Sequence, residues 1–223
     1  MRILITGASG VIGKSLVKML SKHANSIDAT YFSNEFYTES SECEVNIMPY
    51  SQIFKNKKSG IYDQIWHFAT YGQPARFIES WPDVINLNVN DMQHLITLLS
   101  PSGNFFYAST SEMYGNISST ELSIPASDPN AKRAVYTESK RLGEAILSTA
   151  LPERSTFFRI CLAYSPDFKI GDRRVLYELV VKGLLKENIT LLDAGEGNRQ
   201  YIYIDDAIKM MEKIAFNSVI DTK

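Results

Sequence analysis

The segment TGASGVIG, residues 6–13, constrains the fold of this 223-residue chain more than any other. It lies between RILIT, a short aliphatic run, and KSLVKMLSKH, in which Leu16, Val17 and Leu20 recur at helical spacing. A strand, a glycine turn and a helix in this order form the start of a βαβ unit. The chain is therefore predicted to open with a parallel α/β arrangement.

Later segments continue this alternation. IDATYF and YDQIWHFA are typical of strands, VINLNVNDMQHLITLLS of a helix, and NFFYAST of a further strand. Strands that alternate with helices predict an α/β fold with a doubly wound parallel sheet, covered by helices on both faces.

The three glycines of the first turn are suited to binding a dinucleotide. Gly7 permits a tight turn, Gly10 lets backbone amides approach a phosphate, and Gly13 lets the helix pack against the sheet. The N-terminus of the helix is then free to bind the pyrophosphate. A glycine-rich turn without a ligand is the alternative interpretation. The cofactor-binding residues predicted in this turn are Gly7, Ser9, Gly10, Val11, Ile12 and Gly13.

The choice of cofactor depends on the end of the second strand. An acidic residue there would bind the 2′-hydroxyl of the NAD ribose, but Ser33 and Asn34 occupy the expected place. Asp28 comes too early for this role and Glu35 slightly too late. No Arg or Lys stands there to bind a 2′-phosphate. We expect NAD, with NADP left open.

Composition narrows the functional classes. The chain has 23 Lys+Arg against 25 Asp+Glu, without a long run of one sign, so nucleic-acid and membrane-surface binding are not indicated. Cys43 and Cys161 lie far apart and show no metal-ligand spacing, which is typical of free thiols in a reducing compartment. MRILITGASG lacks the longer apolar stretch and the cleavage site typical of a signal peptide, and no apolar run approaches the ~18 residues that span a membrane. We expect a soluble, cytoplasmic protein without a metal.

Tyr136 and Lys140 in YTESK are four positions apart, so they share one face of a helix. A lysine ammonium beside a phenol favours tyrosinate and lowers the tyrosine pKa from its usual ~10, which would make Tyr136 a general base. Such a pair also arises by chance. Upstream, FFYASTSEMYG runs from a strand into hydroxyl groups and a carboxylate, at the end of a parallel strand where α/β sheets bind ligands.

TGASGVIG, STSEMYG, YTESK and GEGNRQYIYIDD together, in this order, resemble the extended short-chain dehydrogenase/reductases that act on nucleotide sugars, the NAD-dependent epimerase/dehydratase family. The resemblance covers essentially the whole chain. It implies a Rossmann NAD(P)-binding domain at residues 1–164 and a small substrate-binding region at residues 165–223. Members of this family continue well past the YIYIDD segment, so we expect the C-terminal region to be incomplete.

The resemblance also implies residue roles. Tyr136 would remove the proton from the sugar 4-hydroxyl as hydride leaves carbon 4, Lys140 would hold the nicotinamide ribose, and Thr110 would bind the same sugar oxygen. Asn46 stands where the family has an aspartate that contacts adenine. The other residues implied are Ile47, Phe68, Ala69 and Thr70 for the cofactor, and Ser111, Arg174 and Arg199 for the substrate.

Glu112 bears on the reaction. In the family, a glutamate at this place is frequent in 4,6-dehydratases and UDP-glucuronate decarboxylases, and a carboxylate there can remove the acidified proton on carbon 5. Glu112 could instead solvate a loop or position Tyr114. The segment GDRRVLYELVVKGLL resembles the decarboxylase branch, whereas RICLAYSP has Leu162 in place of the family's asparagine.

We therefore expect an NAD-dependent nucleotide-sugar enzyme that works through a 4-keto intermediate and leans to dehydration or decarboxylation. A UDP-sugar 4-epimerase and a non-catalytic dinucleotide-binding module remain alternatives. The resemblance further predicts a homodimer, in which the helix of residues 86–99 and the helix carrying Tyr136 form a four-helix interface.

Overall fold

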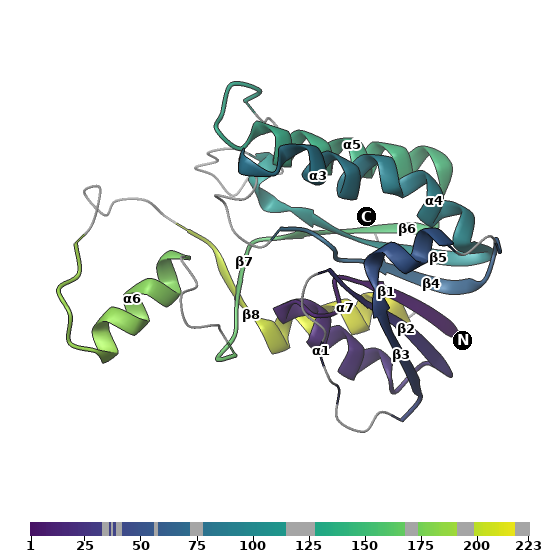
Figure 1. The fold of residues 1–223 in the computed structure, drawn as a ribbon, viewed down its shortest axis with the longest axis horizontal. Coiled ribbons are helices and arrows are strands. Elements are labelled where there is room, and N and C mark those ends of the chain that lie inside the picture. The colour runs from purple at the N-terminus through teal and green to yellow at the C-terminus, as the bar shows by residue number, and fades with distance from the viewer. Residues whose placement is uncertain are drawn as a thin grey trace.

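The centre of the computed structural model is a six-stranded parallel sheet with the order β3-β2-β1-β4-β5-β6 (Figure 1). The structure describes residues 1–32, 36, 38, 42–55, 58–71, 78–114, 128–167, 174–190 and 199–216. The strands of this sheet are β1 (Arg2–Thr6), β2 (Ser26–Tyr31), β3 (Glu44–Pro49), β4 (Tyr62–His67), β5 (Leu99–Thr110) and β6 (Ser155–Ile160). Consecutive strands in this order pair in parallel, which confirms the doubly wound sheet predicted from the sequence.

Helices cover both faces of the sheet (Figure 1). On one face lie α1 (Val11–Leu20) and α7 (Ile204–Phe216), and on the other lie α3 (Trp81–Ile85), a π-helical turn (Asn86–Asn90), α4 (Asp91–Leu98) and α5 (Ala134–Ala150). Alternate residues of β1 point to opposite faces, so Ile3 and Ile5 join one apolar core while Leu4 joins the other.

The helix expected over residues 84–100 is divided in the structure. Its middle is the π-helical turn, and Leu99 and Ser100 belong to β5 rather than to the helix. Asparagine has modest helix propensity, and Asn86, Asn88 and Asn90 fall in this turn. The interruption places the Leu87 carbonyl where it accepts a hydrogen bond from another element.

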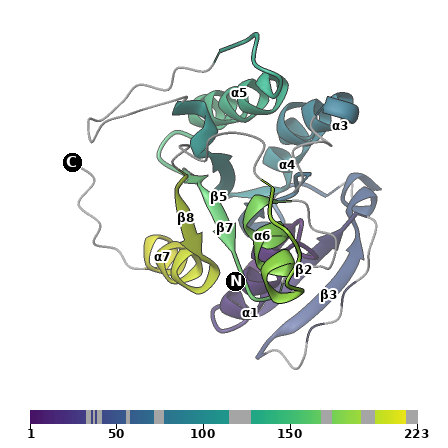
Figure 2. The same ribbon diagram turned by 90° about the vertical axis from the view of Figure 1, so that its left-hand side faces the viewer.

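The C-terminal part adds a small second sheet. β7 (Leu162–Tyr164) pairs in parallel with β8 (Tyr201–Tyr203), and α6 (Val175–Leu184) stands apart from the main sheet (Figures 1 and 2). α7 returns to the main domain, where Ile204, Ala207 and Ile208 are buried in the core beside α1. The predicted domain division at residue 164 stays a prediction. It would assign α7 to the C-terminal region, although α7 packs in the core of the main sheet.

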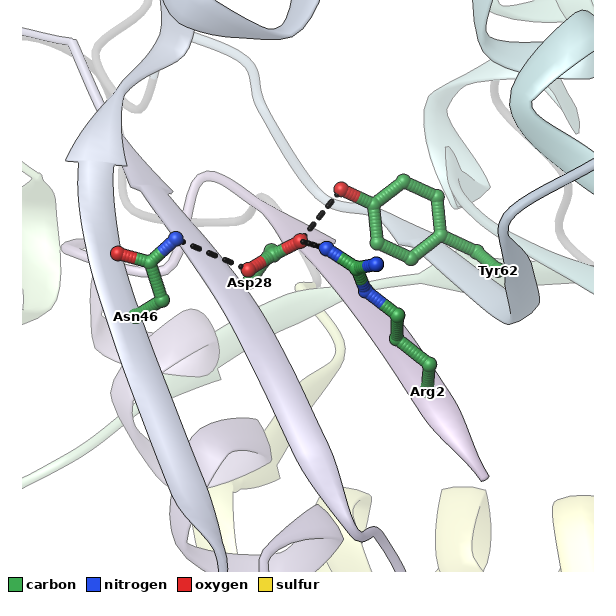
Figure 3. A network of polar contacts seen from close by, with 4 residues as sticks. All are labelled: Arg2, Asp28, Asn46 and Tyr62. Atoms are coloured by element: carbon green, nitrogen blue, oxygen red, sulfur yellow. Dashed lines mark hydrogen bonds and ion pairs between the residues drawn. The ribbon is translucent and has the colours of Figure 1, made fainter. Parts of the chain in front are cut away.

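A buried carboxylate links four strands (Figure 3). Asp28 in β2 accepts hydrogen bonds from Arg2 Nη2 at 2.8 Å, the Tyr62 hydroxyl at 2.6 Å and Asn46 Nδ2 at 3.1 Å. A buried carboxylate is tolerated when its oxygens are satisfied in this way. Burial, followed by the hydrogen bond to Asp28, raises the pKa of Tyr62. Asp28 therefore has a structural role, because its carboxylate joins neighbouring strands of the sheet.

In the described part of the chain, none of the helices has the length and apolar character required to cross a membrane.

The glycine turn yields a stability prediction. A Cβ on Gly13 would lie 2.1 Å from the Gly7 carbonyl oxygen and 2.6 Å from Ala8 Cα, so backbone would have to move. We expect Gly13→Ala to lower the free energy of unfolding by at least ~1–3 kcal/mol. The control is Gly183→Ala in α6, where a Cβ meets nothing within 4 Å; it should be neutral or stabilise by up to ~1 kcal/mol. Urea denaturation measures both, and equal effects would contradict the steric argument.

Candidate active site

The candidate site lies at the carboxyl edge of the sheet, where β1, β4 and β5 are neighbours. Thr6 of β1 is in register with His67 of β4, and His67 is in register with Tyr107 of β5. This edge also bears the glycine turn after β1 and the 3₁₀ turn Ser111–Tyr114 after β5. In parallel α/β sheets it is the edge that binds ligands.

The glycine turn packs directly on the segment that follows β4. Gly7 has a φ of +74°, and a Cβ there would lie 2.7 Å from backbone atoms of Phe68 and Ala69. Gly10 is the N-cap of α1 and no side chain caps this helix end. The first amides of a helix have no partner within the helix, and an N-terminus without a side-chain cap is suited to a phosphate. Phosphate binding by Ser9, Val11 and Ile12 stays a prediction.

His67 holds the ends of β1 and β4 together. Its Nε2 lies 2.7 Å from the Leu87 carbonyl oxygen, to which it donates, so its Nδ1 accepts from the Thr6 hydroxyl at 2.6 Å. The Thr6 oxygen in turn accepts the Ala69 amide at 3.3 Å. Complete burial lowers the pKa of His67 to about 3, so the ring is neutral. His67 is thus a structural histidine that fixes the predicted cofactor residues Phe68 and Ala69, while Thr70 beyond them is exposed.

The remaining predicted cofactor residues lie on or after the second and third strands of the chain. Ser33 and Asn34 lie outside the described residues. Asn46 lies in the middle of β3, with three residues of the strand after it, and its side-chain amide is directed at Asp28 (Figure 3). Ile47 is partly buried against the core on the opposite face. A contact of Asn46 and Ile47 with adenine stays a prediction.

The predicted catalytic residues meet at one place. Thr110 ends β5, its hydroxyl hydrogen-bonds with that of Tyr136, and it accepts the Glu112 amide at 3.2 Å. Tyr136 and Lys140 lie one turn apart on α5. The structure therefore brings Thr110, Glu112, Tyr136 and Lys140 together, as the sequence indicated.

The expected effect of Lys140 on Tyr136 is wrong for this structure. Burial raises the pKa of Tyr136 to about 12, and the hydrogen bond from Thr110 only partly opposes the increase. Burial also lowers the pKa of Lys140 to about 7. Both groups lose solvation of their charged forms, and this loss is the largest cause of both pKa shifts.

Lys140 is fully buried, and its ammonium has no hydrogen-bond partner within the described ranges. Its Nζ lies 4.6 Å from the centre of the Tyr107 ring, a cation–π contact. An unpaired buried cation is costly, so it marks a position where a hydroxyl-bearing ligand would be stabilised. The glycine cradle and this ammonium both fit a dinucleotide.

Two arginines that the sequence analysis did not single out hold the 3₁₀ turn against α5. Arg133 Nη1 donates to Glu112 Oε1 at 2.9 Å. Arg159 of β6 makes two hydrogen bonds to the buried Glu144 carboxylate, at 3.0 and 2.7 Å, and a third to the Tyr114 hydroxyl at 2.6 Å. Glu144 lies one helical turn after Lys140 on α5, and this spacing in the sequence could have indicated that Glu144 belongs to the same face of the helix.

Asn88 was also missed. It is fully buried in the π-helical turn, and its Nδ2 donates to Ser139 Oγ at 3.0 Å, beside Lys140 in sequence. Its side-chain oxygen has no hydrogen-bond partner among the described residues. The cluster NLNVN in an otherwise apolar helix was the signal that could have found it.

The predicted substrate residues are spread over the site and the C-terminal part. Ser111 follows Thr110 in the 3₁₀ turn. Arg174 is the N-cap of α6, with its guanidinium 4.6 Å from the centre of the Tyr177 ring, and Arg199 lies two residues before β8. The substrate contacts of all three stay predictions.

The buried ammonium yields a pH prediction. Because the pKa of Lys140 falls from 10.5 to about 7 on folding, the unfolded chain binds more protons than the folded chain between these values. The free energy of unfolding should therefore rise with pH in this window. We expect the wild type to gain stability over Lys140→Met from about pH 7 to about pH 9 in urea denaturation, while the exposed Lys132→Met follows the wild type. If the free energy of unfolding varied with pH in the same way for the wild type and Lys140→Met, the lowered pKa of a buried, unpaired Lys140 would be refuted.

Comparison with known proteins identifies a family and distant relatives. The model of the NAD dependent epimerase/dehydratase family matches residues 3–219. UDP-glucuronic acid decarboxylase 1 of Xenopus tropicalis is 25% identical over 219 residues, which cover 93% of this chain and 52% of that protein. UDP-glucuronic acid decarboxylase 6 of Arabidopsis thaliana is 25% identical over 227 residues, covering 96% and 66%. The chain thus spans about half to two thirds of these relatives.

Solved structures share the fold. A dTDP-glucose 4,6-dehydratase from Streptomyces venezuelae with NAD bound superposes with a TM-score of 0.76 at 20% identity, covering 96% of this chain and 72% of that one. A UDP-glucuronic acid 4-epimerase from Bacillus cereus in complex with UDP-glucuronic acid and NAD has a TM-score of 0.73 at 19% identity, covering 98% and 74%. Given a family match over nearly its whole length and the Rossmann-like sheet, the chain belongs to the NAD-dependent epimerase/dehydratase family.

Proposed function

We propose that the chain carries out NAD-dependent oxidation of a nucleotide sugar at carbon 4, followed by decarboxylation of the 4-keto sugar acid. The observation that carries the proposal is the hydrogen bond between Tyr136 and Thr110, one helical turn from the buried, unpaired Lys140. A hydroxyl pair beside a buried lysine, next to a glycine cradle, is suited to removing a proton from a sugar hydroxyl near a nicotinamide.

The cofactor would be held by three groups. The amides at the start of α1 would bind the pyrophosphate, Phe68 and Ala69 would form one wall, and Lys140 would donate to a ribose hydroxyl. Bound NAD supplies a hydride acceptor and later returns the hydride. Lys140 is then partnered and keeps its charge, which lowers the pKa of Tyr136 toward the range of a working base.

Tyr136 would first accept the proton of the 4-hydroxyl while Thr110 holds the same oxygen. Carbon 4 becomes a ketone as its hydride leaves. A carboxylate on carbon 5 is then beta to this ketone, so the C5–C6 bond breaks, carbon dioxide departs, and the electron pair is delocalised into the ketone. Carbon 5 takes a proton from solvent, the hydride returns to carbon 4, and Tyr136 returns its proton to the oxygen.

The position of Glu112 favours dehydration as a second candidate. A free carboxylate beside Thr110 could remove the carbon-5 proton, so that water leaves from carbon 6. One Glu112 oxygen is, however, already bound by Arg133 at 2.9 Å. This contact and the decarboxylase relatives support the first candidate.

The proposal predicts the effect of Tyr136→Phe. With NAD and UDP-glucuronic acid, formation of NADH in stopped-flow absorbance should fall by ~10²–10⁴-fold because the base is lost. The affinity for NAD, measured by calorimetry, should stay within about twofold if only the base is lost. Full activity of Tyr136→Phe would overturn the mechanism.

Mass spectrometry of the wild-type products separates the chemistries. Loss of carbon dioxide supports the first candidate, and loss of water from a neutral UDP-hexose supports dehydration. An epimer of unchanged mass indicates a 4-epimerase. NAD binding without turnover of any nucleotide sugar would indicate a binding module.

We also propose that the chain forms a homodimer through α4 and α5. An apolar groove runs between these helices, and Leu142 is 49% exposed on it. A second copy of α4 and α5 would bury this surface in a four-helix interface. The groove is lined by Gln93, Ile96, Leu142, Ala145, Ile146, Thr149 and Ala150.

Leu142→Glu tests the dimer. A charge in the buried interface should convert the dimer to a monomer in light scattering at tens of micromolar protein. Leu184→Glu in α6, where the side chain is 77% exposed, is the matched control and should remain dimeric. A wild-type monomer, or dissociation by both variants alike, would contradict this interface.

A further inference from the structure

Arg133 occupies an unfavourable position for an arginine. It is the N-cap of α5, and no side-chain hydrogen bond caps this helix end. Serine, threonine, aspartate and asparagine are the residues that stabilise an N-cap. A positive charge at the N-terminus of a helix also opposes the helix dipole. Local stability therefore does not explain this residue, and such violations are expected at functional sites.

The ion pair between Arg133 and Glu112 does not offset the unfavourable position of Arg133 at the helix N-terminus. The side chains of Arg133 and Glu112 are 43% and 31% exposed, so water screens their attraction. Pairs of this kind contribute little to stability. What the pair does supply is orientation, because Glu112 fixes the Nη1 corner of the guanidinium.

The other edge of Arg133 has no hydrogen-bond partner among the residues that the structure describes. A guanidinium carries five N–H donors, and only Nη1 makes a hydrogen bond to the described residues. The Nε and Nη2 donors have the fork geometry that binds a carboxylate through two parallel hydrogen bonds.

Arg133 also lies at the same end of α5 as Tyr136. It precedes Tyr136 by three residues, and the Tyr136 amide donates to the Arg133 carbonyl at 3.0 Å. The charges of Glu112 and Arg133 act on the Tyr136 phenol with opposite signs, the first raising and the second lowering the pKa of Tyr136. A sugar with its 4-hydroxyl at Tyr136 would place its carbon-5 substituent near this pair.

We propose that Arg133 binds the carboxylate of a nucleotide-linked uronic acid and thereby selects it over the neutral hexose. This inference rests on the proposed function, and it identifies the substrate class and the residue that recognises it. Glu112 acts as a positioning residue, which holds one corner of Arg133 so that the other edge faces the substrate.

The test is binding measured by calorimetry, in the Tyr136→Phe background with NAD present so that turnover does not interfere. The ligands are UDP-glucuronic acid, UDP-glucose and UDP. With Arg133 intact, we expect at least ~10-fold tighter binding of UDP-glucuronic acid than of UDP-glucose. Arg133→Gln should remove this preference and leave the UDP-glucose affinity within about twofold. Arg133→Lys should keep part of the preference.

Two controls separate recognition from folding. Arg141→Gln makes the same charge change at an exposed position of α5 and should keep the preference. Arg133→Gln should not lower the melting temperature, because it removes a cation from a helix N-terminus. A purely structural role would instead lower the melting temperature and weaken both sugar nucleotides alike.

Glu112→Gln should weaken the preference less than Arg133→Gln, since an amide oxygen can still accept from Nη1. Two outcomes would overturn the inference and leave the proposed function standing. In the first, Arg133→Gln keeps the preference for UDP-glucuronic acid. In the second, the protein with Arg133 intact binds UDP-glucose and UDP but shows no such preference. Absence of binding by all three ligands would overturn the proposed function as well.

Discussion

The close approach of α1 to the ends of β1 and β4 is the constraint on which the rest of the site depends. Gly13 lies against the Gly7 carbonyl, and Gly7 lies against the backbone of Phe68 and Ala69, at distances that leave no room for a Cβ. His67 closes the same junction from the other side through Thr6. With these strand ends fixed, the amides of α1 face the point where the strand order reverses between β1 and β4.

Desolvation dominates the electrostatics of the catalytic helix. Lys140 and Tyr136 would stabilise each other as an ion pair in a medium where both could ionise. Burial opposes both charges, which raises the pKa of the phenol and lowers that of the ammonium. Among the described residues the ammonium has no hydrogen-bond partner, which is the observation behind the proposal that a cofactor hydroxyl pairs with it.

The 3₁₀ turn after β5 is held at two points by arginines. Arg133 binds Glu112 near its start, and Arg159, itself anchored by Glu144, binds Tyr114 at its end. The two contacts differ in character. The second is anchored on a largely buried carboxylate, whereas both partners of the first are partly exposed to solvent. Rigid support on one side and an accessible guanidinium on the other suit a site that must recognise a ligand.

The sequence by itself determined the strand–turn–helix opening, the parallel sheet and the meeting of Thr110, Glu112, Tyr136 and Lys140. The opening and the sheet follow from local spacing and from the alternation of strands and helices, whereas the resemblance to the family implied that the four residues share a site. Contacts between distant segments were not accessible in this way. Asn46, expected at adenine, has its amide directed at Asp28 because register aligns the two in adjacent strands.

The electrostatic balance also required the tertiary structure. Spacing showed that Tyr136 and Lys140 share a helix face, but only packing decided that burial would govern the pKa of each. Arg133 and Arg159 likewise gained their partners only when β5, β6 and α5 came together. Periodicity in a sequence fixes which face a side chain occupies, whereas its solvation and its partners depend on what the rest of the chain places against that face.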